Sequence, residues 1–193
     1  MKKIIILFLC IILNGCISRS KTTNFYGLKN VIFENKVKFN DFNKKILVNN
    51  VSIPNYMDKP QIITLSKDYI KYNISEINRW IEPLNILIQN TLISDMSYYL
   101  NNSIIKEYNL NERDYNYLVN INIRKINNIL DKELYFECFY TIINNKGKII
   151  INDKFIDKLY ISNNFIDLAD KQSEIIGKLA YEIVKNIYKI NNK

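Results

Sequence analysis

Side chains that commonly carry out catalysis are scarce in this chain. Its 193 residues include no histidine, so the chain has no imidazole for nucleophile activation, metal binding or proton transfer near neutral pH. The carboxylate pairs Asp153 and Asp157, and Glu107 and Glu112, have neither a glycine-rich turn nor a nucleophile beside them, and we interpret them as solvated surface charge. The sequence therefore predicts a protein that is not an enzyme and that binds no cofactor or metal ion.

The N-terminal segment has the pattern of a secretory signal. Lys2 and Lys3 precede an apolar run over residues 4–13. Ten helical residues span roughly 15 Å, about half of the hydrocarbon core of a bilayer, so this run is too short to cross a membrane. The following Leu13-Asn14-Gly15-Cys16 resembles the lipobox of bacterial lipoproteins, in which the cysteine is lipidated and becomes the first residue of the mature chain.

The lipobox resemblance implies a signal peptide over residues 1–15, a lipidated tether over 16–24 and one folded domain over 25–193. Two or more acyl chains on Cys16 make a stable anchor, since each buried methylene contributes about 0.8 kcal/mol. Ile17 stands where Asp often marks retention on the inner membrane, so the resemblance favours the periplasmic face of the outer membrane. An ordinary signal peptide that is cut nearby is the alternative.

One cysteine then remains in the folded domain. Cys10 leaves with the signal peptide and Cys16 carries lipid, so Cys138 has no partner for an internal disulfide. Cys138 lies in an apolar strand pattern, where we expect a small buried side chain and not a reactive thiol.

The remaining chain contains seven strand patterns and two helix patterns. Short apolar or alternating runs predict strands over residues 25–28, 45–53, 61–65, 69–74, 117–124, 134–143 and 148–156. The turn Asn144-Asn145-Lys146-Gly147 predicts a hairpin between the last two. Apolar residues at spacings of three and four predict helices over 82–100 and 166–190, with Pro83 in the first turn of the earlier helix. We expect an α+β fold, a mainly antiparallel sheet with two long amphipathic helices packed on one face.

Two motifs in residues 51–84 resemble the PqiC family, the auxiliary lipoproteins of ABC-type and MCE-type transport systems. The first is an aliphatic-Pro pair followed by Tyr-x-Asp-x-Pro-Gln-Ile, and the second is Arg-Trp-x-Glu-Pro-Leu. The matching residues are Pro54, Tyr56, Asp58, Pro60, Gln61, Ile62, Arg79, Trp80, Glu82, Pro83 and Leu84. Met57 and Lys59 replace the family's usual Leu and Arg, and Leu65 stands where many members have Arg.

The motif residues have two physical interpretations. As a docking surface, a loop stiffened by Pro54 and Pro60 projects the apolar side chains of Tyr56 and Met57. The candidate partner or oligomer contacts are Pro54, Tyr56, Met57, Asp58, Pro60, Gln61, Ile62, Arg79, Trp80 and Glu82. As a scaffold, Trp80 lies in the core, Arg79 pairs with a carboxylate such as Asp58, and the loop is merely tight.

The resemblance implies a subunit of an MCE-type system that moves phospholipid between membranes. Such a subunit forms a homo-oligomeric ring and receives the MCE-domain subunit. The alternative is an envelope-assembly lipoprotein that binds peptidoglycan or lipopolysaccharide through a basic face, in line with the net charge of +8. The lysines are scattered, with no basic helix, so we expect no nucleic-acid partner.

Overall fold

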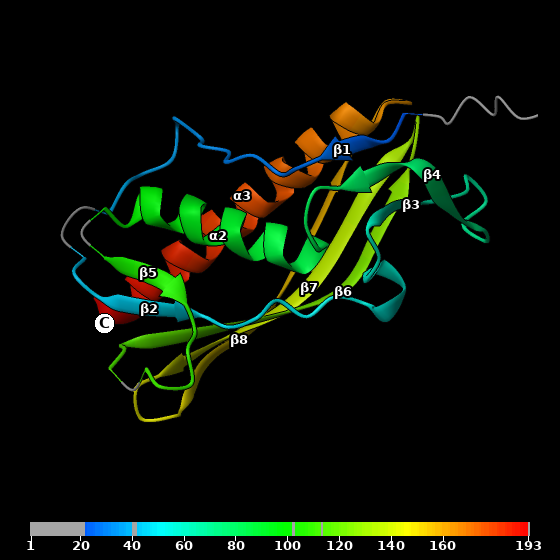
Figure 1. Ribbon diagram of the computed structural model, residues 1–193. Coiled ribbons are helices and arrows are strands. Elements are labelled where there is room, and N and C mark those ends of the chain that lie inside the picture. The colour runs from blue at the N-terminus through cyan, green and yellow to red at the C-terminus, as the bar shows by residue number, and fades with distance from the viewer. Residues whose placement is uncertain (1–21, 40–41, 102, 113, 193) are drawn as a thin grey trace, which may run out of the picture.

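Two helices lie over a five-stranded sheet, and a three-stranded sheet adjoins its end (Figure 1). The structure, a computed structural model, describes residues 22–39, 42–101, 103–112 and 114–192. The predicted signal peptide and Cys16 lie outside the described residues. The elements are β1 (Asn24–Tyr26), β2 (Lys45–Val48), η1 (Asn55–Met57), β3 (Gln61–Leu65), β4 (Tyr72–Trp80), α2 (Leu84–Tyr99), β5 (Ile104–Glu107), β6 (Tyr117–Ile129), β7 (Glu133–Asn144), β8 (Ile149–Leu159) and α3 (Phe165–Asn191).

The larger sheet has the strand order β5-β2-β6-β7-β8. β6, β7 and β8 form an antiparallel meander, whereas β2 runs parallel to both of its neighbours. Alternation along β6 buries Val119, Ile121 and Ile123 and leaves the intervening asparagines on the other face. The predicted turn joins β7 to β8, and Gly147 takes the positive φ of 76° that the turn requires.

The smaller sheet has the order β1-β4-β3. β3 and β4 form an antiparallel hairpin, and β1 runs parallel to β4. The predicted α+β class is confirmed, but there are two sheets where one was expected, and each combines antiparallel with parallel pairs. Apolar alternation specifies which residues face the core, but it does not specify pairing direction, so the parallel partners of β1 and β2 were not predictable from it.

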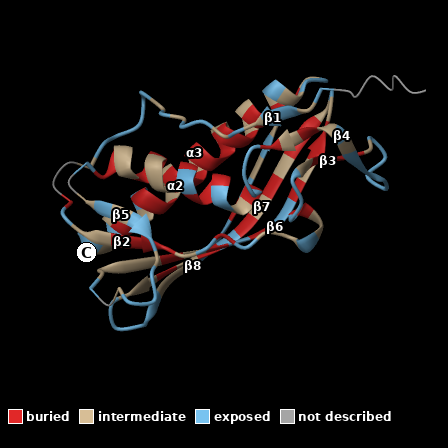
Figure 2. Ribbon diagram, viewed as in Figure 1, coloured by how far each residue is buried: buried red, intermediate tan, exposed pale blue. Residues whose placement is uncertain are grey.

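Both helices lie on the same side of the larger sheet, as predicted (Figure 1). Asn164 caps α3, its side-chain oxygen accepting a hydrogen bond from the backbone N–H of Ile166 at 2.7 Å. The buried stripe of α3 consists of Leu168, Ile175, Ile176, Leu179, Ile183 and Ile187. The buried residues form one layer between helices and sheet (Figure 2). No helix among the described residues combines the length and the apolarity that a membrane crossing requires.

Some elements match their predicted ranges and others do not. β3 has its predicted bounds, and α3 begins one residue earlier than predicted and ends one residue later. β4 extends to Trp80, so Arg79 and Trp80 lie at the end of a strand that was predicted to end at residue 74. β5 was not predicted, because Ile104 and Ile105 are too few apolar residues to reveal a period.

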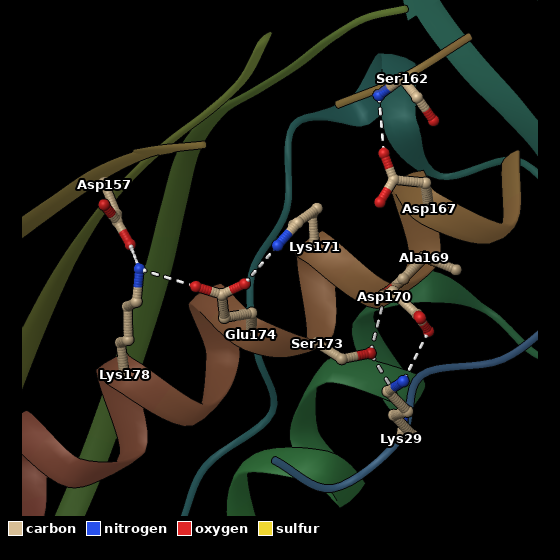
Figure 3. Close-up of polar contacts among 10 residues, drawn as sticks. All are labelled: Lys29, Asp157, Ser162, Asp167, Ala169, Asp170, Lys171, Ser173, Glu174 and Lys178. Atoms are coloured by element: carbon tan, nitrogen blue, oxygen red, sulfur yellow. Dashed lines mark hydrogen bonds and ion pairs between the residues drawn. The ribbon is translucent and has the colours of Figure 1, made fainter. Parts of the chain in front are cut away.

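An N-terminal strap, residues 29–33, lies across the two helices and is held by side chains of both. The N–H of Lys29 donates to Ser173 Oγ at 3.0 Å, that of Val31 to Asp95 Oδ1 at 3.1 Å, and that of Phe33 to the Tyr99 hydroxyl at 3.0 Å. The Lys29 ammonium also pairs with Asp170 of α3 at 2.9 Å (Figure 3).

The strap approaches α3 closely where that helix carries a glycine. A Cβ at Gly177 would lie 2.9 Å from the carbonyl oxygen of Val31, which is closer than packed atoms tolerate. Farther along α3, Lys178 bridges Glu174 and Asp157 of β8 (Figure 3).

A chain of buried side-chain hydrogen bonds joins α3, β6 and β3. Gln172 Nε2 donates to Asn128 Oδ1 at 2.9 Å, and Asn128 Nδ2 donates to the carbonyl oxygen of Ile63 at 2.8 Å. All three residues are buried. Because unpaired polar groups in an apolar interior are costly, these bonds fix the position of β3 against the end of β6.

Asp95 is a buried carboxylic acid at the contact between α2 and the strap. One carboxyl oxygen accepts the bond from Val31, and the other is buried without a partner in the described structure. Burial raises the pKa of Asp95 to about 7. The neutral acid is therefore the form that the folded protein favours.

We expect Asn128→Ala to lower the free energy of unfolding by roughly 2–4 kcal/mol, because it leaves two buried groups unpaired. Urea denaturation of the variant, of a control variant and of the unchanged protein measures this loss of stability. Asn127→Ala is the matched control, since Asn127 is only partly buried and lies on the opposite face of β6. Equal losses for the two variants would contradict the assigned role of Asn128.

The raised pKa of Asp95 predicts a pH dependence of stability. Between pH of about 4 and about 7 the folded protein binds one more proton than the unfolded chain, so stability falls as pH rises through that window. Asp95→Asn stays neutral at every pH. The variant should melt on the order of 10 °C higher than the unchanged protein at pH 8 and close to it at pH 4. A constant difference between the two proteins across this range would show that Asp95 does not titrate as stated.

Candidate functional site

A groove of about 270 Å³ brings together residues from both motifs. Phe25 of β1 forms one wall, the loop after η1 forms another, and the end of β4 with the connection to α2 forms the third. The lining residues are Phe25, Asp58, Lys59, Pro60, Arg79, Trp80, Ile81, Glu82 and Pro83. Two motifs that are about 20 residues apart in sequence thus form one surface feature.

Backbone hydrogen bonds hold the groove walls in place. The N–H of Trp80 donates to the carbonyl of Pro60 at 2.8 Å, which joins the two motifs directly. The N–H of Ile81 donates to the carbonyl of Tyr26, also at 2.8 Å. Since Pro60 has no N–H and a fixed φ, it closes the loop at the position where β3 begins.

The loop before the groove is a compact turn. The N–H of Met57 donates to the carbonyl of Pro54 at 2.8 Å, and the N–H of Lys59 donates to the carbonyl of Met57 at the same distance. Residues 55–57 form the short helix η1, which the sequence analysis did not predict. These hydrogen bonds close the loop between Pro54 and Pro60 into a compact turn.

The structure divides the predicted contact residues into three groups by exposure. Asp58, Pro60 and Glu82 are exposed, Pro54, Tyr56, Gln61 and Arg79 are partly buried, and Met57, Ile62 and Trp80 are buried. Met57 is 3% exposed and packs in the core, so the expectation that it projects from the loop is wrong. The Met57 side chain points inward because the turn of η1 directs it toward the apolar interior.

Two aromatic residues of the motifs also pack within the fold. Trp80 is 3% exposed and belongs to the core, as the scaffold interpretation expected. Tyr56 packs against Tyr72, with ring centroids 5.0 Å apart. Burial raises the pKa of Tyr56 to about 12, so its hydroxyl stays protonated near neutral pH.

Arg79 supplies an unused hydrogen-bond donor in the groove. Its Nε is buried and has no partner in the described structure. Among the described residues Arg79 makes no ion pair with Asp58 or Glu82, so the pairing that the scaffold interpretation expected is absent. A buried donor without an acceptor costs about 1–3 kcal/mol, and the terminal N–H groups of the same guanidinium, which are not among the buried unpaired atoms, are the donors that an incoming carbonyl or carboxylate can reach. The sequence signal that marked Arg79 was the motif, and not its chemistry.

The remaining candidate chemistry is structural. Lys106 and Lys45 hold Glu112 in its ionised form and lower its pKa to about 2. Asp157 pairs with Lys178 at 3.0 Å. Cys138 is fully buried, and burial raises the pKa of its thiol to about 12. The described residues contain no cluster of acidic or cysteine side chains placed to bind a metal ion.

A second, larger hollow of about 910 Å³ lies between β2 and the connection from β5 to β6. Its lining consists of Asn49, Asn50 and residues 106–112. None of the predicted contact residues lies in it. Asparagine-rich loops occur throughout this sequence, so no residue pattern distinguished this one.

Comparison with known proteins agrees with the motif resemblance. A family model described as the ABC-type transport auxiliary lipoprotein component matches residues 26–184. The intermembrane transport lipoprotein PqiC of Escherichia coli K12 is 20% identical over 190 residues, which cover 98% of this chain and all of that protein. The protein of the same name from Shigella flexneri matches to the same extent.

Solved structures share the fold. A crystal structure of an uncharacterized protein superposes with a TM-score of 0.72 at 17% identity, covering 86% of this chain and 99% of that one. A crystal structure of a Xanthomonas campestris protein superposes with a TM-score of 0.64 at 11% identity, covering 84% and 92%. The family model spans both motifs and most of the described chain, and the chain belongs to the family of ABC-type transport auxiliary lipoprotein components.

Proposed function

We propose that the protein is a membrane-anchored subunit of an MCE-type system that moves phospholipid between the membranes of a bacterial envelope. Family membership is the observation that carries this proposal. The protein contributes an anchor and a docking surface, and other subunits supply the conduit and the energy.

The anchor in this proposal is lipid on Cys16, at the periplasmic face of the outer membrane. The lipobox-like residues 13–16 support it, together with the lipoprotein description of the family. Two or more acyl chains hold a protein on a bilayer where a single chain holds it only transiently.

The docking surface in this proposal is the groove at the motif residues, and its occupant is the MCE-domain subunit. Arg79 lines the groove with a guanidinium that has no ion-pair partner among the described residues, and the exposed side chains of Phe25 and Ile81 offer apolar contact. A peptide segment with a carboxylate or a free backbone carbonyl fits this combination. We further propose that several copies form a ring around the end of that subunit.

Binding of peptidoglycan or lipopolysaccharide through a basic face is the second candidate. The ion pairs argue for a smaller role of the basic surface than the net charge suggests. The lysines paired with carboxylates are Lys29, Lys45, Lys67, Lys106, Lys154, Lys158, Lys171 and Lys178. Binding that weakens steeply as salt rises would favour this candidate over apolar docking.

The anchor can be tested at Cys16. The mature protein should carry acyl chains on that residue, seen by mass spectrometry of its N-terminal peptide, and should fractionate with membranes. A Cys16→Ala chain whose residues 1–15 are replaced by a cleavable, non-lipidating secretory signal should appear in the soluble periplasmic fraction. Cys138→Ala is the control, since it removes a thiol elsewhere and should remain with the membrane. Membrane attachment of the Cys16→Ala chain would rule out the anchor.

The docking groove can be tested with Arg79→Met, which keeps the length of the side chain and removes its donors. Binding to the MCE-domain subunit should weaken roughly tenfold to hundredfold, as expected for the loss of a charge-assisted hydrogen bond. The thermal midpoint of the isolated variant should be unchanged or higher, because an unpaired buried donor is gone. Arg124→Met, an exposed arginine outside the groove, should leave binding unchanged. Unaltered binding by the Arg79 variant would place the docking surface elsewhere.

A further inference from the structure

Exposed apolar and tyrosine side chains gather at one end of the domain. We call this end the tip surface and define it by Tyr69, Ile70, Tyr160 and Ile166. These side chains come from the β3–β4 turn, the end of β8 and the start of α3. Ile70 is the most exposed of them, at 80%. Side chains of this kind in a group mark an interaction surface more often than scattered exposed residues do.

Specific contacts hold these segments together. Asp131, in the β6–β7 turn, pairs with Lys67 at 2.8 Å and accepts a hydrogen bond from the Tyr160 hydroxyl at 3.2 Å. The Tyr69 hydroxyl donates to Glu133 at 2.9 Å, and the ammonium of Lys132 lies 4.2 Å from the centre of the Tyr69 ring. These contacts join the β3–β4 turn, the β6–β7 turn and Tyr160 at the end of β8.

Hydrogen bonds within the β3–β4 turn hold Ile70 at the apex of the turn. The N–H of Tyr69 donates to the carbonyl of Ser66, and the N–H of Lys71 donates to the hydroxyl of Ser66, both at 2.9 Å. The N–H of Ile70 donates to Asp68 Oδ1 at 3.1 Å. Tyr69 has a φ of 64°, which is rare for an aromatic residue. Strained residues persist where the surroundings over-determine them, and here the strained conformation presents an apolar side chain to the outside.

The start of the described chain lies at the same end. Figure 1 shows the first described residues, the start of α3 and the β6–β7 turn at this end, and the rings of Tyr26 and Phe165 are 6.1 Å apart. Cys16 precedes Thr22 by six residues, so a lipid on Cys16 lies within about 20 Å of Thr22 even along a fully extended chain. By contrast, β6 is 13 residues long, so the far end of the larger sheet lies about 40 Å from the tip surface.

We propose that the tip surface contacts the lipid bilayer itself, with Ile70 inserted among the headgroups. This inference rests on the proposed anchor at Cys16. A convex apolar apex flanked by tyrosine hydroxyls and by Lys67 and Lys132 matches the membrane interface, where amphipathic rings and long basic side chains keep their polar ends in water. The short tether brings the bilayer to this end of the domain, and the contact fixes how the domain stands on the membrane.

The test uses the lipidated full chain on vesicles of phosphatidylethanolamine and phosphatidylglycerol. Ile70→Cys introduces an exposed thiol for an environment-sensitive fluorophore, while the native thiol of Cys138 is buried and protonated. The label should shift its emission to the blue, and a quencher attached to the lipids should reduce its fluorescence. Leu110→Cys is the matched control, since Leu110 is 84% exposed and lies in the β5–β6 connection at the other end of β6 (Figure 1).

Quenching at position 70 should exceed that at position 110 several-fold. If the chain floats with the vesicles and the label at position 70 stays in water, the tip surface does not touch lipid, and the proposal is overturned while the anchor stands. If the chain does not float, the anchor fails and this inference fails with it. A blue shift without vesicles would assign the surface to contacts between copies of the chain and would also overturn the proposal.

Discussion

The side chain of Asn128 determines where the two sheets meet. Its amide accepts from Gln172 of α3 and donates to the backbone of β3, in a region from which water is excluded. Apolar packing is not directional and tolerates small slips, whereas two buried hydrogen bonds at one amide tolerate almost none. The position of β3 is therefore fixed relative to both the larger sheet and the second helix. The groove and the tip surface depend on it, because each lies at one end of the β3–β4 hairpin.

Much of the fold was predictable from the sequence, and the failures share a physical cause. β3 has its predicted bounds because Pro60 has no N–H to donate to a sheet, so the strand begins after it, and because the turn that begins at Ser66 ends the strand. The apolar stripe of α3 gave that helix to within one residue at each end. The parallel partners of β1 and β2 are contacts between segments far apart in sequence, and nothing local encodes them. The strand predicted over 69–74 lies at 72–80: residues 69–71 belong to the turn before it, and polar residues dominate its middle, where the strand bulges away from β3.

The candidate site was predictable as a set of residues but not as an arrangement. The two motifs do meet, through the hydrogen bond from Trp80 to Pro60. Which side chains face outward depends on the short helix η1, and it reverses the expected exposure of Met57. That Arg79 lacks an acceptor was also not predictable from the sequence. Asp58 and Glu82 lie near Arg79 in the motifs, but in the structure neither carboxylate pairs with it. Spacing indicates which charges are neighbours, and only geometry shows which of them bind.

The proposed bilayer contact and the proposed docking groove lie at opposite ends of one hairpin. Leu65 pairs with Tyr72 beside the tip surface, and Gln61 pairs with Arg79 beside the groove. The five residues of β3 separate these two pairs by about 13 Å, because the extra residues of β4 are taken up in its bulge. In the proposed orientation the groove lies farther from the lipid than Ile70 does, and a protein partner can reach Arg79 without displacing the membrane contact. In this proposal one hairpin carries both contacts, so the orientation of the domain on the bilayer also sets the orientation of the groove toward its partner.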